Sequence, residues 1–218
     1  MRRRIRQLGH FDREIVSASS MNIIFDLGGV VVRWEPEALL ARTFDNPGIC
    51  KVVHRQFLAH PDWLELDRGT LAPEDAVARA ARRTGLADNL FANLLNNLPS
   101  SLVPIPETVE LLYRLKAQGH SLYCLSNMHF ASIEFLERTH GFWDVFKGKV
   151  ISCRVNLCKP EAEIYAHLFE TFQIDAANAV FVDDVEVNLA AARKFDIRTI
   201  RYESSVQCAG ELRALGCL

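Results

Sequence analysis

Three apolar runs in this chain each end in polar side chains that can take part in chemistry. The first run ends at Asp26, the second at Ser126-Asn127 and the third at Asp183-Asp184. In open α/β sheets, ligands bind beyond the carboxyl ends of the strands. If the runs are neighbouring parallel strands, these side chains meet at one edge of a sheet. They could bind and transform an anionic substrate there.

Asp26 is the candidate nucleophile. A carboxylate can attack phosphorus and form an acyl phosphate, which divides one difficult transfer into two easier ones. Lys159, just ahead of Pro160, could neutralise charge on that carboxylate and on a transferring phosphoryl group. Taken singly, both residues have ordinary alternatives, because Asp often caps a turn or helix and an isolated Lys is usually exposed.

The other two strand ends suggest phosphate and metal binding. The Ser126 hydroxyl and the Asn127 amide could hold phosphate oxygens, although both residue types are also common in turns. The adjacent carboxylates of Asp183 and Asp184 repel each other unless a cation or proton lies nearby. Mg²⁺ binds one or two carboxylates together with water and phosphate. The pair, with Asn188 shortly after it, therefore predicts a magnesium site; the alternative is a solvated acidic turn.

The elements that must position these residues alternate between strands and helices. Buried parallel strands read as continuous apolar runs, and helices as apolar residues three or four positions apart. The alternation is typical of an α/β fold, here a Rossmann-like three-layer core with a central parallel sheet. We expect strands over 23–26, 121–126, 149–152, 179–183 and 197–201, and helices over 106–117, 132–138, 160–172 and 188–195.

The segment 35–103 breaks this alternation, because it contains helical patterns and no convincing strand. A crossover between parallel strands needs only about a dozen residues. We therefore expect an inserted all-helical cap domain over 35–103, and a core composed of 21–34 and 104–218. Within the insertion, helices are predicted over 36–44, 49–59, 73–84 and 87–98.

Composition argues against several classes of protein. The chain of 218 residues is 49% hydrophobic with a formal net charge of −2, which gives no support for the basic stripe that nucleic-acid binding requires. No apolar run approaches the ~20 residues of a membrane span. The six cysteines show no regular spacing, which predicts free thiols in a reducing, cytoplasmic compartment. The basic segment 1–20 lacks the apolar region of a signal peptide and is expected to be a disordered tail. The alternative is an amphipathic targeting peptide, against which Asp12 and Glu14 argue, and Met21 is an alternative natural start.

Together, these residues resemble the four motifs of the haloacid dehalogenase-like hydrolase superfamily. Phe-Asp-Leu-Gly-Gly-Val over 25–30 resembles the first motif and Leu-Ser-Asn over 125–127 the second. Lys-Pro-Glu over 159–161 resembles the third, and Phe-Val-Asp-Asp over 181–184, with Asn188, the fourth. The order and spacing of the motifs also agree, which implies a hydrolase with this superfamily's α/β core.

The helical insertion is similar to a cap of this superfamily. The stretch 63–71, Trp-Leu-Glu-Leu-Asp-Arg-Gly-Thr-Leu, further resembles the branch that contains sugar-phosphate phosphatases and the N-terminal phosphatase domain of epoxide hydrolase. Substrate choice would rest with the cap, and candidate lining residues are Trp34, Trp63, Asp67 and Arg68. The resemblance implies a Mg²⁺-dependent phosphatase for a small phosphorylated metabolite, for instance a sugar phosphate. We expect neither nucleic acid nor a membrane as partner, and the oligomeric state stays open.

The resemblance also implies roles for individual residues. Asp26 would be the nucleophile that carries the aspartyl-phosphate intermediate, and it would also be a Mg²⁺ ligand. Lys159 would neutralise charge beside it and contact the phosphate. Ser126 and Asn127 would bind the phosphate. For the metal, the further ligands would be the main-chain carbonyl of Gly28 and the carboxylate of Asp184, with Asp183 beside them or acting through water.

Gly28 is a departure from the usual pattern of the superfamily. Most of its phosphatases have Asp at this position, which protonates the leaving oxygen and then activates water. Such acid–base catalysis is worth about 10²–10⁴-fold. Gly28 has no side chain for either task, so the reaction needs a good leaving group or another proton donor. His129 could supply the proton, and its alternative is an exposed loop histidine.

Two other functions remain open from the sequence. A metal-independent 2-haloacid dehalogenase also lacks the second carboxylate of the first motif, but those relatives do not usually keep the acidic pair Asp183-Asp184. A catalytically weak binding or regulatory protein would explain Gly28, but it gives no physical reason to retain Asp26, Lys159 and Asp184 together.

Overall fold

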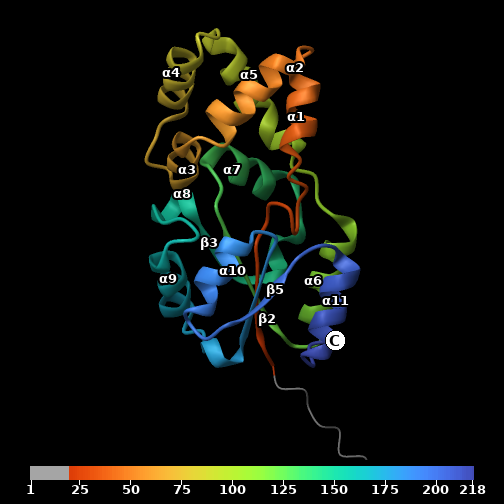
Figure 1. Ribbon diagram of the computed structural model, residues 1–218. Helices are drawn as coiled ribbons and strands as arrows, with labels where there is room; N and C mark the ends of the chain where they lie inside the picture. Colours follow the sequence, from red (N-terminus) through yellow and green to blue (C-terminus); the bar gives the residue numbers. More distant parts are fainter. Residues whose placement is uncertain (1–19) are drawn as a thin grey trace, which may run out of the picture.

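A five-stranded parallel sheet forms the centre of the computed structural model, which describes residues 20–218 (Figure 1). β1 lies in the middle, and the order across the sheet is β3-β2-β1-β4-β5. The predicted α/β fold with a central parallel sheet is therefore confirmed. The expected tail, apart from Ser20, lies outside the described residues. The strands are β1 Asn22–Phe25, β2 Ser121–Ser126, β3 Phe146–Ile151, β4 Ala179–Asp183 and β5 Arg198–Arg201.

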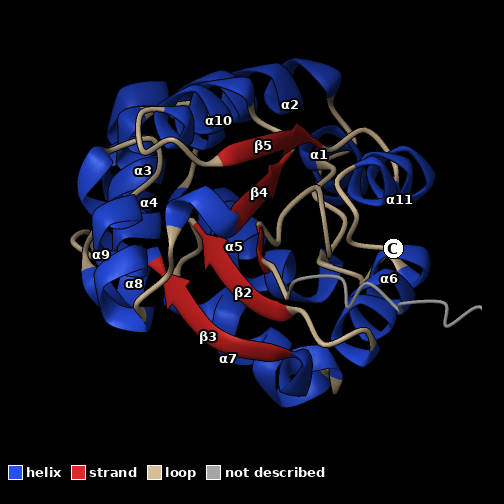
Figure 2. Cartoon of the chain, turned by 90° about the horizontal axis from the view of Figure 1, so that it is seen from below, coloured by secondary structure: helices blue, strands red, loops and turns tan. Residues whose placement is uncertain are grey.

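Both faces of the sheet are covered by helices (Figure 2). Successive side chains of a strand face opposite sides. Thus Ile23 and Phe25 belong to one apolar core, shared with α6, α7 and α11, and Ile24 belongs to the other, shared with α9 and α10. The helices outside the cap region are α6 Pro106–Ala117, α7 Phe130–Thr139, α8 Ser152–Val155, α9 Ala162–Phe172, α10 Glu186–Arg193 and α11 Ser205–Ala214.

The strand β3 and the helix α11 are among the elements that differ from the sequence prediction. The edge strand β3 starts at Phe146 rather than at residue 149, because its first residues alternate between buried and exposed positions instead of forming an apolar run. Helix α11 was not predicted, since its pattern is only weakly amphipathic. It begins at a capping box in which the Ser204 and Gln207 side chains bond to each other's main-chain N–H groups.

Every helix and helical turn between residues 36 and 101 lies at one end of the molecule (Figure 1, top). Proline at the first turn starts four of these helices, and Gly69 and Gly85 end two of them in the left-handed conformation. The short helix α3 was not predicted. The cap, as the term is used below, comprises α1 Pro36–Thr43, α2 Pro47–Val53, the π-helical turn His54–Leu58, α3 Pro61–Arg68, α4 Pro73–Thr84 and α5 Asp88–Ser101.

The structure also bears on the state of the cysteines and on the character of the helices. All six cysteines are free thiols. Among residues 20–218, no helix combines the length and the apolar character needed to cross a membrane.

Candidate active site

Asp26 lies just beyond β1 with one carboxylate oxygen already engaged. The sheet register pairs Phe25 with Val182 of β4, and the Asp26 main-chain N–H donates to the Val182 carbonyl at 2.9 Å. Asp26 Oδ1 accepts from the Leu27 main-chain N–H at 2.7 Å and lies 2.9 Å from the Lys159 ammonium. The residue is 7% exposed and lines a cavity. It is thus a carboxylate held in one orientation beside a cation.

Lys159 is a buried cation shared by two carboxylates. Its ammonium lies 2.9 Å from Asp26 Oδ1 and donates to Asp183 Oδ2 at 2.7 Å. Burial by itself lowers the pKa of a lysine, but the attraction of Asp26 and Asp183 outweighs burial and raises the pKa of Lys159 above its ordinary value. Lys159 therefore stays charged where negative charge on a phosphoryl group would be neutralised.

Asn127 holds the Lys159 loop in place. Its Oδ1 accepts from the Lys159 main-chain N–H, and its Nδ2 donates to the Lys159 carbonyl, both at 2.8 Å. Both ends of the amide are thus used within the protein, although Asn127 also lines the cavity. Ser126 is buried at the end of β2 and is not among the described residues that line the cavity. Phosphate binding by these two residues stays a prediction, and the contacts show a positioning role for Asn127.

Asp183 supports the site from the end of β4. It is fully buried, and its Oδ1 accepts from the Val185 main-chain N–H at 2.8 Å. Both of its oxygens lie 3.1 Å from the Asn188 side-chain amide nitrogen, and Oδ2 also accepts from Lys159. A buried carboxylate is tolerated when it is paired and hydrogen-bonded in this way. Asp183 is therefore largely occupied in holding Lys159.

The acidic cluster of Asp26, Asp183 and Asp184 fits a small divalent cation. One carboxylate oxygen of each residue lies within 4.8 Å of the others. Asp184 approaches Gly29 so closely that a Cβ at position 29, where φ is +76°, would lie 2.4 Å from Asp184 Oδ2. Hard oxygen ligands in small number, next to open space for water and phosphate, are what Mg²⁺ prefers. Because Asp183 is engaged elsewhere, Asp26 and Asp184 are the carboxylates best placed to hold it.

The proton affinity of this cluster is consistent with a cation site. Burial raises the pKa of Asp26 from 3.8 to about 7, and repulsion from Asp183 and Asp184 adds to this effect against the lowering by Lys159. Burial and the charge of Asp183 likewise raise the pKa of Asp184. A bound cation opposes both effects, because it favours the ionised carboxylates.

The cavity above Asp26 has a volume of about 350 Å³ and extends to the cap. Of the cap-facing residues named from the sequence, Trp34, Trp63 and Asp67 line it, and the two indole rings stack with centroids 6.2 Å apart. Arg68 does not line it, because its guanidinium pairs with Glu161 at 2.6 Å. The remaining apolar wall was not predicted from the sequence, and it comprises Leu64, Leu98, Leu102, Met128, Val185 and Val187.

One signal for this wall is present in the sequence. Val185 and Val187 lie within three residues of the acidic pair Asp183-Asp184 in the sequence. In the structure their side chains are 43% and 57% exposed. Leu98 and Leu102 give no such signal, because their contact with the cavity depends on how α5 packs on the core.

His129 lines the same cavity but is buried, so the alternative of an exposed loop histidine is wrong. Its Nε2 lies 3.0 Å from the Ser132 hydroxyl oxygen. Burial lowers the pKa of His129 to about 4. The imidazole is therefore neutral at neutral pH and is not a ready proton donor.

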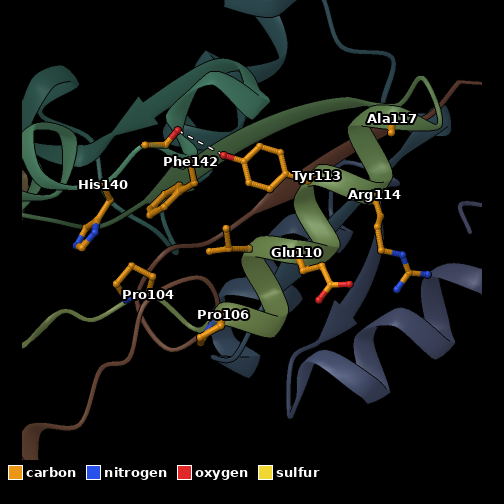
Figure 3. A pocket seen from close by; sticks show the side chains of 10 residues that line it. Pro104, Pro106, Glu110, Tyr113, Arg114, Ala117, His140 and Phe142 are labelled. Carbon is orange, nitrogen blue, oxygen red and sulfur yellow. Dashed lines mark hydrogen bonds between the residues drawn. The ribbon is translucent and has the colours of Figure 1, made fainter.

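A second hollow on the surface of the core is larger and has a different character (Figure 3). It has a volume of about 760 Å³ and lies between α6 and the loop that follows α7, with Tyr113 and Phe142 among its lining residues. Its charged lining residues, Glu110 and Arg114, are exposed. Buried charged groups are therefore a feature of the first cavity and not of this hollow.

The chain matches a family model described as haloacid dehalogenase-like hydrolase over residues 21–196. It is 28% identical over 195 residues to the sesquiterpene phosphatase astK of Aspergillus oryzae, a match that covers 89% of this chain and 96% of that protein.

Solved structures with the same fold include two that hold different bound groups. The HAD family enzyme bt-2542 of Bacteroides thetaiotaomicron, in complex with magnesium and inorganic phosphate, superposes with a TM-score of 0.67 at 23% identity, covering 83% of this chain and 93% of that one. The L-2-haloacid dehalogenase of Xanthobacter autotrophicus, with chloropropionic acid covalently bound, superposes with a TM-score of 0.63 at 20% identity, covering 89% and 83%. At these identities the likeness shows the fold alone.

Proposed function

Because the chain belongs to the haloacid dehalogenase-like hydrolase family, we propose that it is a Mg²⁺-dependent phosphatase that hydrolyses a small phosphate monoester through an aspartyl-phosphate at Asp26. The observation that carries this proposal is the arrangement of Asp26, Lys159 and Asp184 around one end of the cavity. It provides a nucleophile, a charge neutraliser and a metal ligand within reach of one substrate.

The reaction follows from these positions. Asp26 attacks phosphorus, the bond from phosphorus to the ester oxygen breaks, and the leaving oxygen takes up a proton. Water then attacks the phosphorus of the aspartyl-phosphate and releases Asp26 and inorganic phosphate. Lys159 stabilises charge on the phosphoryl oxygens in both steps, because its ammonium is held beside the attacking carboxylate.

The metal would be held by Asp26, Asp184 and the Gly28 main-chain carbonyl, with Asp183 behind them. When bound, Mg²⁺ would supply positive charge that orients the phosphate and favours the ionised form of Asp26. Gly28 lines the cavity, as this role requires. We also propose the division into a cap over 35–103 and a core over 21–34 and 104–218.

For the substrate, we propose an ester of an apolar alcohol rather than the sugar phosphate expected from the sequence. The cavity walls consist mainly of indole, leucine, methionine and valine side chains. A sugar would leave hydroxyl groups without partners against such walls, at a cost for each one. The relative astK is named a sesquiterpene phosphatase, and the phosphate ester of a sesquiterpene alcohol belongs to this apolar class.

The test is phosphate release from p-nitrophenyl phosphate by the wild type and Asp26→Asn, with Mg²⁺ and with a chelator. We expect activity only for the wild type with Mg²⁺. Equal activity in the two proteins would refute the proposal. Chelator-resistant halide release from 2-chloropropionate would instead support the dehalogenase.

A further inference from the structure

The absence of a side chain at Gly28 leaves the leaving group without a proton donor on the core side of the site. This inference rests on the proposed phosphatase reaction. In an in-line displacement, the leaving oxygen departs opposite the attacking oxygen. Asp26 attacks from the end of β1, so the leaving oxygen faces the cap. A replacement donor must therefore be sought among the cap residues that line the cavity.

The end of α3 is fixed to the core by several contacts. The Ser152 hydroxyl donates to the Asp67 main-chain carbonyl, and the Asn156 side chain donates to the Arg68 carbonyl at 2.9 Å. The Arg68 guanidinium also donates two hydrogen bonds to Glu161, at 2.7 and 2.6 Å. Such a two-pronged arginine–carboxylate pair constrains orientation as well as distance. The main chain at Asp67 is thereby held against the core, with the Asp67 side chain at the cavity.

Elimination among the titratable residues of the cavity leaves Asp67. Asp26 is the nucleophile, Lys159 is bound between two carboxylates, and Asp184 is in the cation cluster. His129 is buried and neutral. Asp67, in contrast, forms no ion pair with a cation of the described chain, although it is largely shielded from water.

We propose that Asp67 of the cap is the proton donor to the leaving oxygen and takes over the task that Gly28 cannot perform. As the bond from phosphorus to the ester oxygen breaks, its electron pair goes to that oxygen, which takes the Asp67 proton and leaves as the alcohol. The Asp67 carboxylate then accepts a proton from the water that attacks the aspartyl-phosphate. Both residues return to their starting states.

The protonation behaviour of Asp67 supports this assignment. Burial raises the pKa of Asp67 to about 7, against the lowering by a hydrogen bond from the His129 main chain. The charge of Asp26 adds to the rise, while the charge of Lys159 and a hydrogen bond with the Trp63 side chain oppose it. Near neutral pH, a carboxyl group of this kind is present in both forms. It can therefore both give and accept a proton, as a general acid–base catalyst must.

The test compares two substrates whose leaving groups differ in their need for a proton. The hexanolate that leaves from hexyl phosphate is strongly basic and needs a proton, whereas p-nitrophenolate leaves without a proton. The measured quantity is kcat/KM with Mg²⁺, because it reports steps up to the departure of the leaving group. For Asp67→Asn we expect a fall of about 10²–10⁴-fold with hexyl phosphate and of less than about tenfold with p-nitrophenyl phosphate. Asp67→Ala should likewise lose far more activity with hexyl phosphate than with p-nitrophenyl phosphate. Agreement between the two variants excludes a folding defect of one variant as the cause.

The matched control is Asp75→Asn, which changes an exposed carboxylate on another cap helix and should leave both values unchanged. Equal loss on both substrates, or no loss on either, would overturn the role of Asp67. In that case the proposed phosphatase still stands if the wild type releases phosphate and Asp26→Asn does not. A wild type that hydrolyses neither ester would overturn both proposals.

Discussion

The core side and the cap side of the cavity are held together by different interactions. On the core side, Asp26, Lys159 and Asp183 are joined by contacts of 2.7–2.9 Å, and the Lys159 main chain is bonded twice to Asn127. On the cap side, the wall is apolar and includes Trp63 of α3, whose ring stacks on the core residue Trp34.

The two sides of the cavity therefore differ in how well they tolerate substitution. On the core side, removing the Lys159 ammonium leaves the carboxylates of Asp26 and Asp183 buried without their cation, which costs about 3–5 kcal/mol. On the cap side, apolar side chains of similar volume can replace one another for less than about 1.5 kcal/mol. The core side is therefore suited to a fixed reaction, and the cap side to variation in the substrate. Asp67 is the exception, because it is a cap residue that acts in the reaction itself.

The largest effect is expected on the core side, for Lys159→Met. Without the ammonium, Asp26 and Asp183 repel each other, and no lysine or arginine remains among the described residues that line the cavity. We expect kcat/KM for p-nitrophenyl phosphate to fall by about 10³-fold, given the ~10²–10³-fold typical of one electrostatic donor and the added loss at Asp26. Steady-state phosphate release measures this, with thermal unfolding as a check on folding. A fall of less than about tenfold would mean that the core side is not the reaction centre.

A second effect concerns stability and pH. Because the pKa of Asp26 is raised from 3.8 to about 7 in the folded protein, ionising this residue costs folding free energy. The cost is absent below about pH 4, grows up to about pH 7 and is constant above it. Asn cannot ionise, so in Mg²⁺-free buffer Asp26→Asn should be more stable than the wild type at about pH 8. The difference should be at most about 4 kcal/mol, from ~1.4 kcal/mol per pKa unit.

Thermal unfolding from about pH 4 to pH 8 checks this expectation, and the difference should vanish at the acid end. Mg²⁺ should narrow the difference at about pH 8, because it stabilises the ionised wild type. A wild type that is more stable than Asp26→Asn at about pH 8 without Mg²⁺ would contradict the expectation that ionised Asp26 destabilises the folded protein.

The smallest effect is expected on the cap side, for Trp63→Ala. Losing part of the apolar wall should reduce kcat/KM for a long-chain alkyl phosphate about tenfold more than for ethyl phosphate, in line with the ~10–200-fold effects of small apolar groups in a pocket. Tyr113→Ala, which removes an exposed aromatic ring outside the cavity, is the control. An equal fall for both esters would show that Trp63 supports the fold without selecting the substrate.

The positions of Asp26, Asp183 and Asp184 could be predicted from the sequence, because each follows a buried run and parallel pairing places strand ends at one edge. Lys159 could be predicted to join them from the resemblance of its motif. The hydrogen bonds by which the Asn127 side chain holds the Lys159 main chain could not be predicted, because Asn127 lies 32 positions away in the sequence. Asp67 was named only as a lining residue. Its place over the site depends on how α3 packs against Ser152, Asn156 and Glu161, which no local pattern specifies.

The central claim is that the carboxylate of Asp26 carries the phosphoryl group. The most direct measurement is to quench the wild type during turnover of an alkyl phosphate with Mg²⁺, reduce it with borohydride, and locate the modified residue by peptide mass spectrometry. Borohydride converts an aspartyl-phosphate to homoserine. We predict homoserine at position 26, dependent on both substrate and Mg²⁺. An unmodified Asp26 in an enzyme that is turning over, or homoserine at another aspartate, would contradict the account.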